Sequence, residues 1–170
     1  MELIIQRIIK IKYPHFIKYF FTMILLIVLI VPAKLYPYKI VGYKEKIMIK
    51  DLDMKYSALM DTGAGLCTLH AYGIRMKRRN NKLYVRFYTS NKKGQRLRIE
   101  KRVVNIVSIR SSNGLIERRF VIYLTISLAK ISRKVQVTLT NRIRMSTRIL
   151  IGRNFLKGLF LVDSSRKNIT

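Results

Sequence analysis

The sequence predicts an all-β domain that has one short helix near its C-terminus and is preceded by an apolar N-terminal helix. Apolar and polar residues alternate in several runs between residues 83 and 139, which is the pattern of half-buried strands. Turn signals separate these runs, and a cation-flanked apolar segment stands at the N-terminus. About 135 residues follow that segment, enough for one domain with a single hydrophobic core.

Residues 1–33 have the pattern of an export signal. Four cations precede an apolar run over residues 19–31, which Pro32 ends. The run is short of the roughly 20 residues that a membrane-spanning helix needs, but it suits a signal peptide or a signal anchor. A buried core helix is the alternative, and the confinement of the cations to one side of the run disfavours it. We therefore expect residues 34–170 to form a domain outside the cytoplasm.

Alternation and turn chemistry place the central strands. Three runs predict strands at residues 83–87, 120–128 and 135–139. Ser112-Asn113-Gly114 lies between two strand-like runs and predicts a tight hairpin, because Asn-Gly tolerates the positive φ angles that such a turn needs. Residues 91–94, Asn-Lys-Lys-Gly, predict a competing hairpin.

Asp61-Thr62-Gly63-Ala64 has the strongest chemical signal in the chain, and it directly follows the apolar segment 58–60. A carboxylate in this position can hold a water molecule, a neighbouring hydroxyl can hydrogen-bond across a site, and glycine lets the backbone turn tightly. Asp-Thr-Gly alone is also an ordinary turn sequence. The flanking and distant segments must therefore decide its meaning.

A second apolar segment, residues 149–151, runs into Gly152-Arg153-Asn154. We expect a short helix over residues 153–157 and a final strand over residues 159–162.

Together the two motifs resemble those of the retropepsin-like aspartic proteases, in which an apolar strand ends in Asp-Thr-Gly-Ala and a later Ile-Ile-Gly-Arg-Asn type segment packs beside it. The resemblance is closer to a bacterial branch labelled ATP-dependent zinc protease, and it extends over roughly residues 40–168. Its further matching segments are Thr68–Ala71, Tyr84–Phe87, Leu139–Arg142 and the tail from Ile151 to Asp163. It implies a single retropepsin-like lobe, which is half of a closed acid-protease barrel. With the export signal, it implies a bacterial inner-membrane protein with a periplasmic domain, or a periplasmic protein after cleavage.

The resemblance implies an aspartic endopeptidase, whose chemistry needs two carboxylates that share one proton. The chain has one Asp-Thr-Gly, and none of Asp51, Asp53 and Asp163 is set in such a turn. The implied solution is a symmetric homodimer in which Asp61 of each subunit meets at the two-fold axis and Thr62 hydrogen-bonds across the interface.

The resemblance also assigns roles to single residues. Asp61, Thr62 and Gly63 are expected to be catalytic, and Ala64, Asn113 and Gly114 to contact a protein or peptide substrate. The hairpin at residues 112–114 is the candidate flap, with residues 91–94 as its competitor.

Gly152 and Arg153 are expected to support the site. Retroviral members have an acidic residue two positions beyond the glycine of Asp-Thr-Gly, where this chain has Gly65. Arg153 therefore needs another partner, such as a backbone carbonyl or a carboxylate of the other subunit.

No metal or other cofactor is expected. Cys67 and His70 are the only soft ligands near the motif, fewer than the three or four that zinc requires. We expect Cys67 to be a small apolar core residue and His70 a strand-end residue with a local partner. The sequence has no Gly-rich phosphate loop with Lys-Ser/Thr for ATP.

The chain is strongly basic, with 35 Lys and Arg against eight Asp and Glu. We expect this charge to be spread over the surface, with residues 77–79 and 92–93 in loops. No nucleic-acid-binding motif accompanies it, so nucleic acid is not expected as a partner, whereas contact with an anionic membrane surface is. The function predicted is that of an aspartic endopeptidase; the alternative is a non-catalytic binding module on a retropepsin-like lobe that works through its basic surface.

Overall fold

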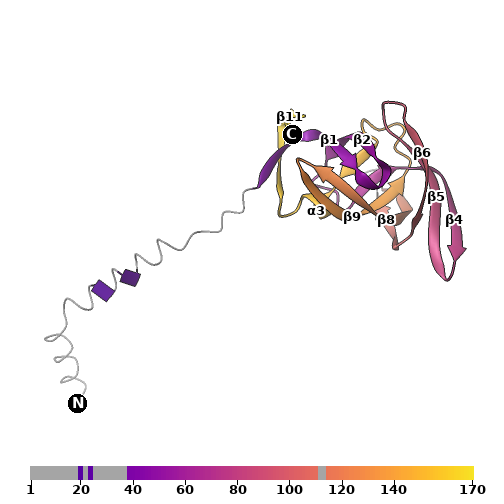
Figure 1. Cartoon of the computed structure of the whole chain (residues 1–170), viewed down its shortest axis with the longest axis horizontal. Helices are drawn as coiled ribbons and strands as arrows, with labels where there is room; N and C mark the ends of the chain where they lie inside the picture. Colours follow the sequence, from indigo (N-terminus) through magenta and orange to yellow (C-terminus); the bar gives the residue numbers. More distant parts are fainter. Residues whose placement is uncertain (1–18, 21–22, 25–37, 111–113) are drawn as a thin grey trace, which may run out of the picture. The chain divides into compact units, whose positions relative to one another are not determined.

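The computed structural model describes residues 19–20, 23–24, 38–110 and 114–170 (Figure 1). Most of the predicted N-terminal apolar helix and signal segment lies outside these residues, as do Ser112 and Asn113. Within the described ranges, no helix has the length and apolar character needed to cross a membrane.

A closed ring of six strands forms the body of the domain. In ring order the strands are β1 (Lys39–Ile49), β2 (Met54–Met60), β10 (Ile149–Ile151), β3 (Cys67–His70), β9 (Ile131–Thr140) and β8 (Ile116–Leu128). Antiparallel pairing of β8 with β1, at Met48 with Ser127 and Ile49 with Ile126, closes the ring. The all-β prediction is thereby confirmed, with the strands arranged as a single lobe.

The remaining elements lie around this ring (Figure 1). β11 (Phe160–Lys167) runs parallel to β1, and β7 (Asn105–Arg110) pairs with β8. A separate three-stranded sheet contains β4 (Tyr72–Arg79), β5 (Lys82–Ser90) and β6 (Arg96–Arg102). A 3-10 turn, η1 (Lys50–Leu52), joins β1 to β2, and the short helix α3 (Arg153–Leu156) joins β10 to β11.

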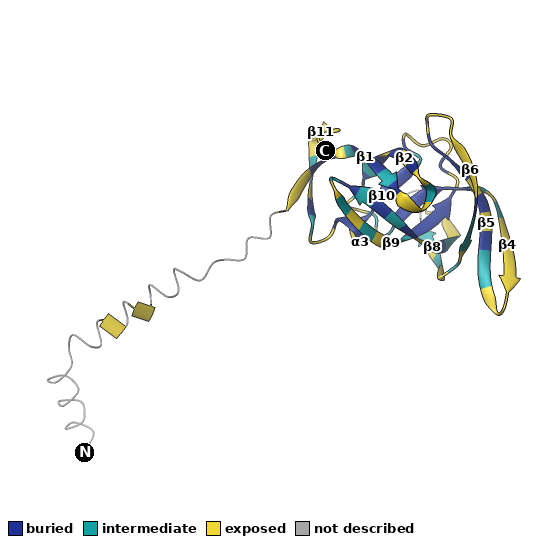
Figure 2. Cartoon of the chain, in the orientation of Figure 1, coloured by how far each residue is buried: buried dark blue, intermediate teal, exposed yellow. Residues whose placement is uncertain are grey.

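Buried residues are concentrated in the strands of the ring (Figure 2). Along β8 and β9 they alternate with more exposed residues, as the sequence pattern requires. Along β8, Ile122, Leu124 and Ile126 are fully buried, and Ile47 and Ile49 of β1 are buried with them. Burial of one such side chain stabilises a fold by about 1.5–3 kcal/mol. The core thus holds β2 and β10, the two strands that lead into the motifs, in a fixed place.

Of the two charged segments expected in loops, one is placed wrongly. Residues 77–79 do not lie in a loop: they end β4, which pairs with β5 through a two-residue turn at Asn80 and Asn81, both with positive φ. β4 is exposed on both faces over most of its length, so it has no apolar alternation to reveal it. Residues 92–93 lie in the loop between β5 and β6, as expected, and they line a pocket together with four other lysines.

The predicted turn at residues 91–94 joins β5 to β6, which pair antiparallel. β7 and β8 also pair antiparallel, but the predicted turn between them lies mostly outside the described residues. Asn91 organises the first turn, since its side-chain oxygen accepts hydrogen bonds from the backbone N–H groups of Lys93 and Gln95. The final strand, β11, is longer than expected and reaches Lys167.

Candidate active site

Asp61 stands at the end of β2, where backbone hydrogen bonds fix its position and orientation. Its N–H donates to the carbonyl of Ile151 in β10 at 2.9 Å. Its carboxylate oxygen Oδ1 accepts from the N–H groups of Gly63, at 2.9 Å, and Ala64, at 3.1 Å. The side chain is only partly buried, so a carboxylate of fixed orientation remains open to water.

Small residues are needed beside this carboxylate. A Cβ added at Gly63 would lie 3.2 Å from Asp61 Oδ1, tighter than ordinary contact. Thr62 and Gly63 are both exposed, and Ala64 is half-buried. Thr62 thus lies on the surface of the lobe, next to Asp61.

Arg153 ties the second motif to the first. Its Nη1 donates to the carbonyl oxygens of Thr62, at 2.8 Å, and Gly63, at 2.7 Å. This supplies the partner that the sequence left open when Gly65 replaced the acidic residue. The planar guanidinium can satisfy both carbonyls from one side, which a single ammonium would do less well.

Gly152 allows the two loops to touch. A Cβ on Gly152 would lie 2.6 and 2.7 Å from the carbonyl carbon and oxygen of Leu66. The next two N–H groups bind the same loop: Arg153 donates to the carbonyl of Ala64 at 2.9 Å, and Asn154 to that of Gly65 at 3.2 Å. Any residue larger than glycine at position 152 would push these segments apart.

Asn154 is a supporting residue that the sequence did not single out. Its Oδ1 accepts from the backbone N–H of Cys67 at 3.0 Å, and its Nδ2 donates to the carbonyl of Gln136 at 2.8 Å. One side chain therefore connects α3 to β3 and β9. Its position within the motif Gly152-Arg153-Asn154 could have indicated this supporting role.

His70 and Arg142 form a buried polar pair beside the site. The sequence did not predict that these two residues interact. His70 Nδ1 accepts from the backbone N–H of Arg142 at 2.9 Å, and the imidazole stacks on Tyr72. Burial lowers the pKa of His70, and the positive charges of Arg148 and Arg142 lower it further. His70 thus ends β3 with a local partner, as expected.

The guanidinium of Arg142 lies within electrostatic reach of the catalytic candidate. Only 8% of Arg142 is exposed, and its Nε donates to the carbonyl of Thr147. Burial lowers the pKa of Arg142 and the charge of Arg119 acts in the same direction, whereas the Asp61 carboxylate raises it. The polar surroundings of Asp61 therefore include a cation, Arg142, that the Asp-Thr-Gly motif does not predict.

Cys67 is a core residue, as expected, and its thiol is protonated at neutral pH because burial raises its pKa to about 11. In the part of the chain that the structure describes, no three His, Cys, Asp or Glu side chains lie close enough together to hold a metal ion. Of the predicted substrate-binding residues, Asn113 lies outside the described residues, and Gly114 precedes β8 with φ +81°. The structure brings together Asp61 to Ala64, Gly152 and Arg153.

The fold and the joined motifs define a retropepsin-like lobe. Residues 40–170 match the family described as RimB-like, retropepsin-like aspartic endopeptidase RimB. The chain belongs to this family. The retropepsin-like part of the predicted resemblance is therefore confirmed.

Relatives of known sequence and structure support the same grouping. The chain is 39% identical over 111 residues to a probable alpha-L-glutamate ligase of Shewanella halifaxensis, covering 64% of this chain and 24% of that protein. For the protein of the same name in Parasynechococcus marenigrum, the identity is 32% over 128 residues, covering 73% and 28%. The chain thus spans about a quarter of the length of these relatives. They are named as ligases rather than as zinc proteases.

A solved structure has a similar fold over nearly its whole length. Lpg0085 of Legionella pneumophila, a protein of unknown function, superposes with a TM-score of 0.65 and 31% sequence identity. The match covers 77% of this chain and 97% of that chain.

Proposed function

We propose that the chain is an aspartic endopeptidase in which Asp61 activates water for attack on a peptide carbonyl. The observation that carries the proposal is the Asp61 carboxylate itself, held by two backbone N–H groups at the end of a buried strand and open to solvent. A general base needs this combination of fixed orientation and access to water. Thr62 and Gly63, fixed by Arg153, complete the catalytic turn.

The second carboxylate is proposed to come from a second copy of the chain. Two Asp61 side chains that share one proton would supply the base and the acid of the reaction. Thr62 is exposed next to Asp61, and this supports its proposed hydrogen bond across a two-fold interface. The homodimer is therefore part of the mechanism, because one subunit supplies half of the site.

We propose acidic peptides, rich in glutamate, as the substrate class. Two features support this proposal. In the relatives, the matching region is about a quarter of a protein named for α-L-glutamate ligation. This chain also carries a formal net charge of +27, which favours encounter with anionic substrates. The candidate flap at residues 112–114, with Ala64, would contact the peptide near the scissile bond.

We further propose a location for the domain and a membrane contact. Residues 1–33 would export the domain, leaving it anchored at the inner membrane or free in the periplasm, where the basic surface would contact anionic lipid. The mechanism through Asp61 uses no metal, so the label of ATP-dependent zinc protease is not part of the proposal. A fusion of alkaline phosphatase after residue 170 would be active if this topology holds and inactive if the domain stays in the cytoplasm.

The test of the protease proposal is Asp61→Asn in the purified full chain, assayed on a fluorogenic glutamate-rich peptide. Asn keeps the shape of the side chain but cannot act as the base, so we expect hydrolysis to fall by at least about a thousandfold with an unchanged melting temperature. Asp53→Asn is the matched control, because Asp53 is exposed and has positive φ, which Asn tolerates. Undiminished hydrolysis by Asp61→Asn would overturn the mechanism through Asp61, and a wild-type chain that hydrolyses nothing would leave the binding-module alternative.

A further inference from the structure

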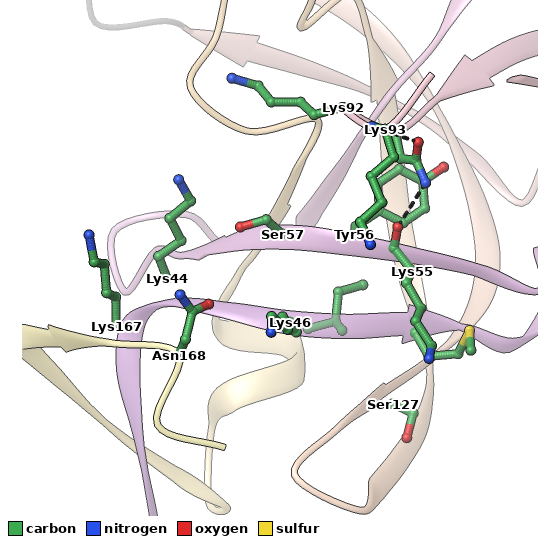
Figure 3. A pocket seen from close by; sticks show the side chains of 13 residues that line it. Lys44, Lys46, Lys55, Tyr56, Ser57, Lys92, Lys93, Ser127, Lys167 and Asn168 are labelled. Atoms are coloured by element: carbon green, nitrogen blue, oxygen red, sulfur yellow. Dashed lines mark hydrogen bonds between the residues drawn. The ribbon is translucent and has the colours of Figure 1, made fainter. Parts of the chain in front are cut away.

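A pocket on the outer face of β1 and β2 has six lysines, and no acidic residue, among the described residues that line it (Figure 3). Its volume is about 640 Å³. We call it the lysine pocket, because six lysines line it: Lys44, Lys46, Lys55, Lys92, Lys93 and Lys167. None of the residues from Asp61 to Ala64 lines it, nor do Gly152 and Arg153. It is therefore a separate feature from the catalytic turn.

Strand periodicity puts these lysines on one face. In β1, Glu45 and Ile47 point into the domain and are buried, so Lys44 and Lys46 point outward. In the neighbouring β2, Lys55 lies opposite Met48 on the same outer face. The floor of the pocket is thus a regular strand pair.

Hydrogen bonds to the backbone of the floor hold the two walls. On one side, Asn91 Nδ2 donates to the carbonyl of Lys55 at 3.1 Å and fixes the turn that carries Lys92 and Lys93. On the other side, the N–H of Asn168 donates to the carbonyl of Lys44 at 2.8 Å and fixes the end of β11 beside Lys167.

Buried Glu45 strengthens the second wall. Its carboxylate accepts from the backbone N–H groups of Ile169, at 3.0 Å, and Thr170, at 3.2 Å, and from that of Gly42 at 2.7 Å. Burial raises the pKa of Glu45, but these hydrogen bonds outweigh burial and hold the pKa below its usual value. An ionised Glu45 therefore keeps residues 167–170 in place at neutral pH without facing the pocket.

The positive charge of the pocket has no partner within the described part of the chain. None of the six lysines makes an ion pair there. Lys44 and Lys167 are partners in the register of the parallel strands β1 and β11, so two like charges stand on neighbouring strands and repel each other. An anion in the pocket would relieve this repulsion.

We propose that the lysine pocket is an exosite that binds a carboxylate-rich stretch of the substrate at a distance from Asp61. This inference rests on the acidic-peptide substrate proposed above. Side chains on one face of an extended peptide recur about every 6.7 Å, the same spacing that separates Lys44 and Lys46 along β1. Alternate glutamates of an extended peptide therefore match alternate lysines of the strand.

The lining also favours a peptide over single-stranded nucleic acid. Proteins that bind single strands stack bases on exposed aromatic rings. The one aromatic residue of the lining, Tyr56, is only 3% exposed and its hydroxyl lies within hydrogen-bond distance of Thr89. The pocket therefore has six lysines and a mostly apolar lining, without an exposed aromatic ring on which a base could stack.

An exosite makes a kinetic prediction that a role in catalysis does not. Peptides long enough to reach both regions should have a lower KM than short ones, while kcat stays the same, because the extra contacts do not change in the transition state. Removal of pocket lysines should erase this dependence on length.

The test measures binding of a fluorescein-labelled α-linked dodecaglutamate by anisotropy to the full chain carrying Asp61→Asn, so that no cleavage occurs. Lys44→Gln, Lys46→Gln and Lys167→Gln are combined on that background. Lys46 and Lys167 are exposed and Lys44 is half-buried. Removing these three charges together should raise Kd roughly tenfold. The control combines Lys82→Gln, Lys130→Gln and Lys157→Gln, three exposed lysines outside the pocket, and should change Kd less than about twofold.

Each outcome decides the proposal. Equal weakening in both triple variants, or none in either, would overturn the exosite in favour of diffuse charge. If inorganic polyphosphate displaces the peptide at a lower charge concentration, or if only binding to phosphatidylglycerol vesicles depends on the pocket lysines, the occupant is a phosphate polyanion or a membrane and the proposal fails. Should the triple variant unfold, Lys46→Gln alone is compared with Lys82→Gln. If the wild-type chain cleaves nothing but binding depends on the pocket lysines, the protease proposal is contradicted and the binding site stands. If the chain cleaves the peptide but binding does not depend on these lysines, the protease proposal stands and the exosite is contradicted.

Discussion

The catalytic turn and the lysine pocket are built on the same strand, β2, but they are held in opposite ways. The catalytic turn is fixed by backbone hydrogen bonds, by Gly152 and by the two hydrogen bonds of Arg153, with almost no room for a larger side chain. The lysine pocket has a fixed floor and fixed walls, but its working groups are the ends of long exposed side chains. Chemistry requires the first kind of site, and the capture of a flexible polyanion tolerates the second.

Among the variants that test this difference between the two sites, Gly152→Ala is expected to have the largest effect on stability and activity. The added Cβ would meet the backbone of Leu66 at 2.6 Å, which cannot move without separating the two loops. We expect a loss of about 3 kcal/mol in the free energy of unfolding, measured by urea denaturation, together with a loss of hydrolysis. Gly65→Ala is the control, because its Cβ would meet only Arg153 Nη2 at 3.9 Å. Equal stability of the two variants would show that the loops are not closely packed.

A smaller effect is expected from Arg153→Lys, which keeps the charge and loses the planar donor. The carbonyls of Thr62 and Gly63 then share a single ammonium, and we expect a loss of about 1 kcal/mol in stability with a larger loss in kcat. Arg133→Lys is matched, since Arg133 Nη1 also donates to two carbonyls, those of Phe155 and Lys157. It should lose similar stability and retain kcat. If both variants keep full kcat, Arg153 does not position the catalytic turn.

The smallest effect concerns pH and the buried His70. Its pKa is lowered in the folded protein, so the unfolded chain binds the proton more readily. Stability should therefore be complete above the ordinary histidine pKa of about 6.5 and fall as the pH drops below it, levelling off at the lowered value. Urea denaturation between pH 7.5 and about pH 5.5 would measure this, above the range where carboxylates titrate. His70→Asn should flatten the slope; an unchanged slope would assign it to another group.

Local pattern explains which parts of the fold and site could be predicted. Alternation revealed β8 and β9 because each has one buried face, and Asp61 to Ala64 and Gly152 to Asn154 are contiguous motifs. β4 escaped because both of its faces are largely exposed. The lysine pocket could not be predicted for another reason. Its lysines come from positions 44 to 167 and are brought together by strand pairing. Burial of Arg142 likewise depends on the loop between β9 and β10.

The most direct test of the central claim, that two Asp61 side chains form one site, is a subunit-mixing measurement. Wild-type chain and Asp61→Asn chain are unfolded together, refolded in varied ratios at constant total concentration, and assayed on the glutamate-rich peptide. If each site needs Asp61 from both subunits, activity will follow the square of the wild-type fraction, so an equal mixture will retain about one quarter of full activity. A linear dependence, with about one half retained, would mean that a single chain is active and would contradict the shared dyad.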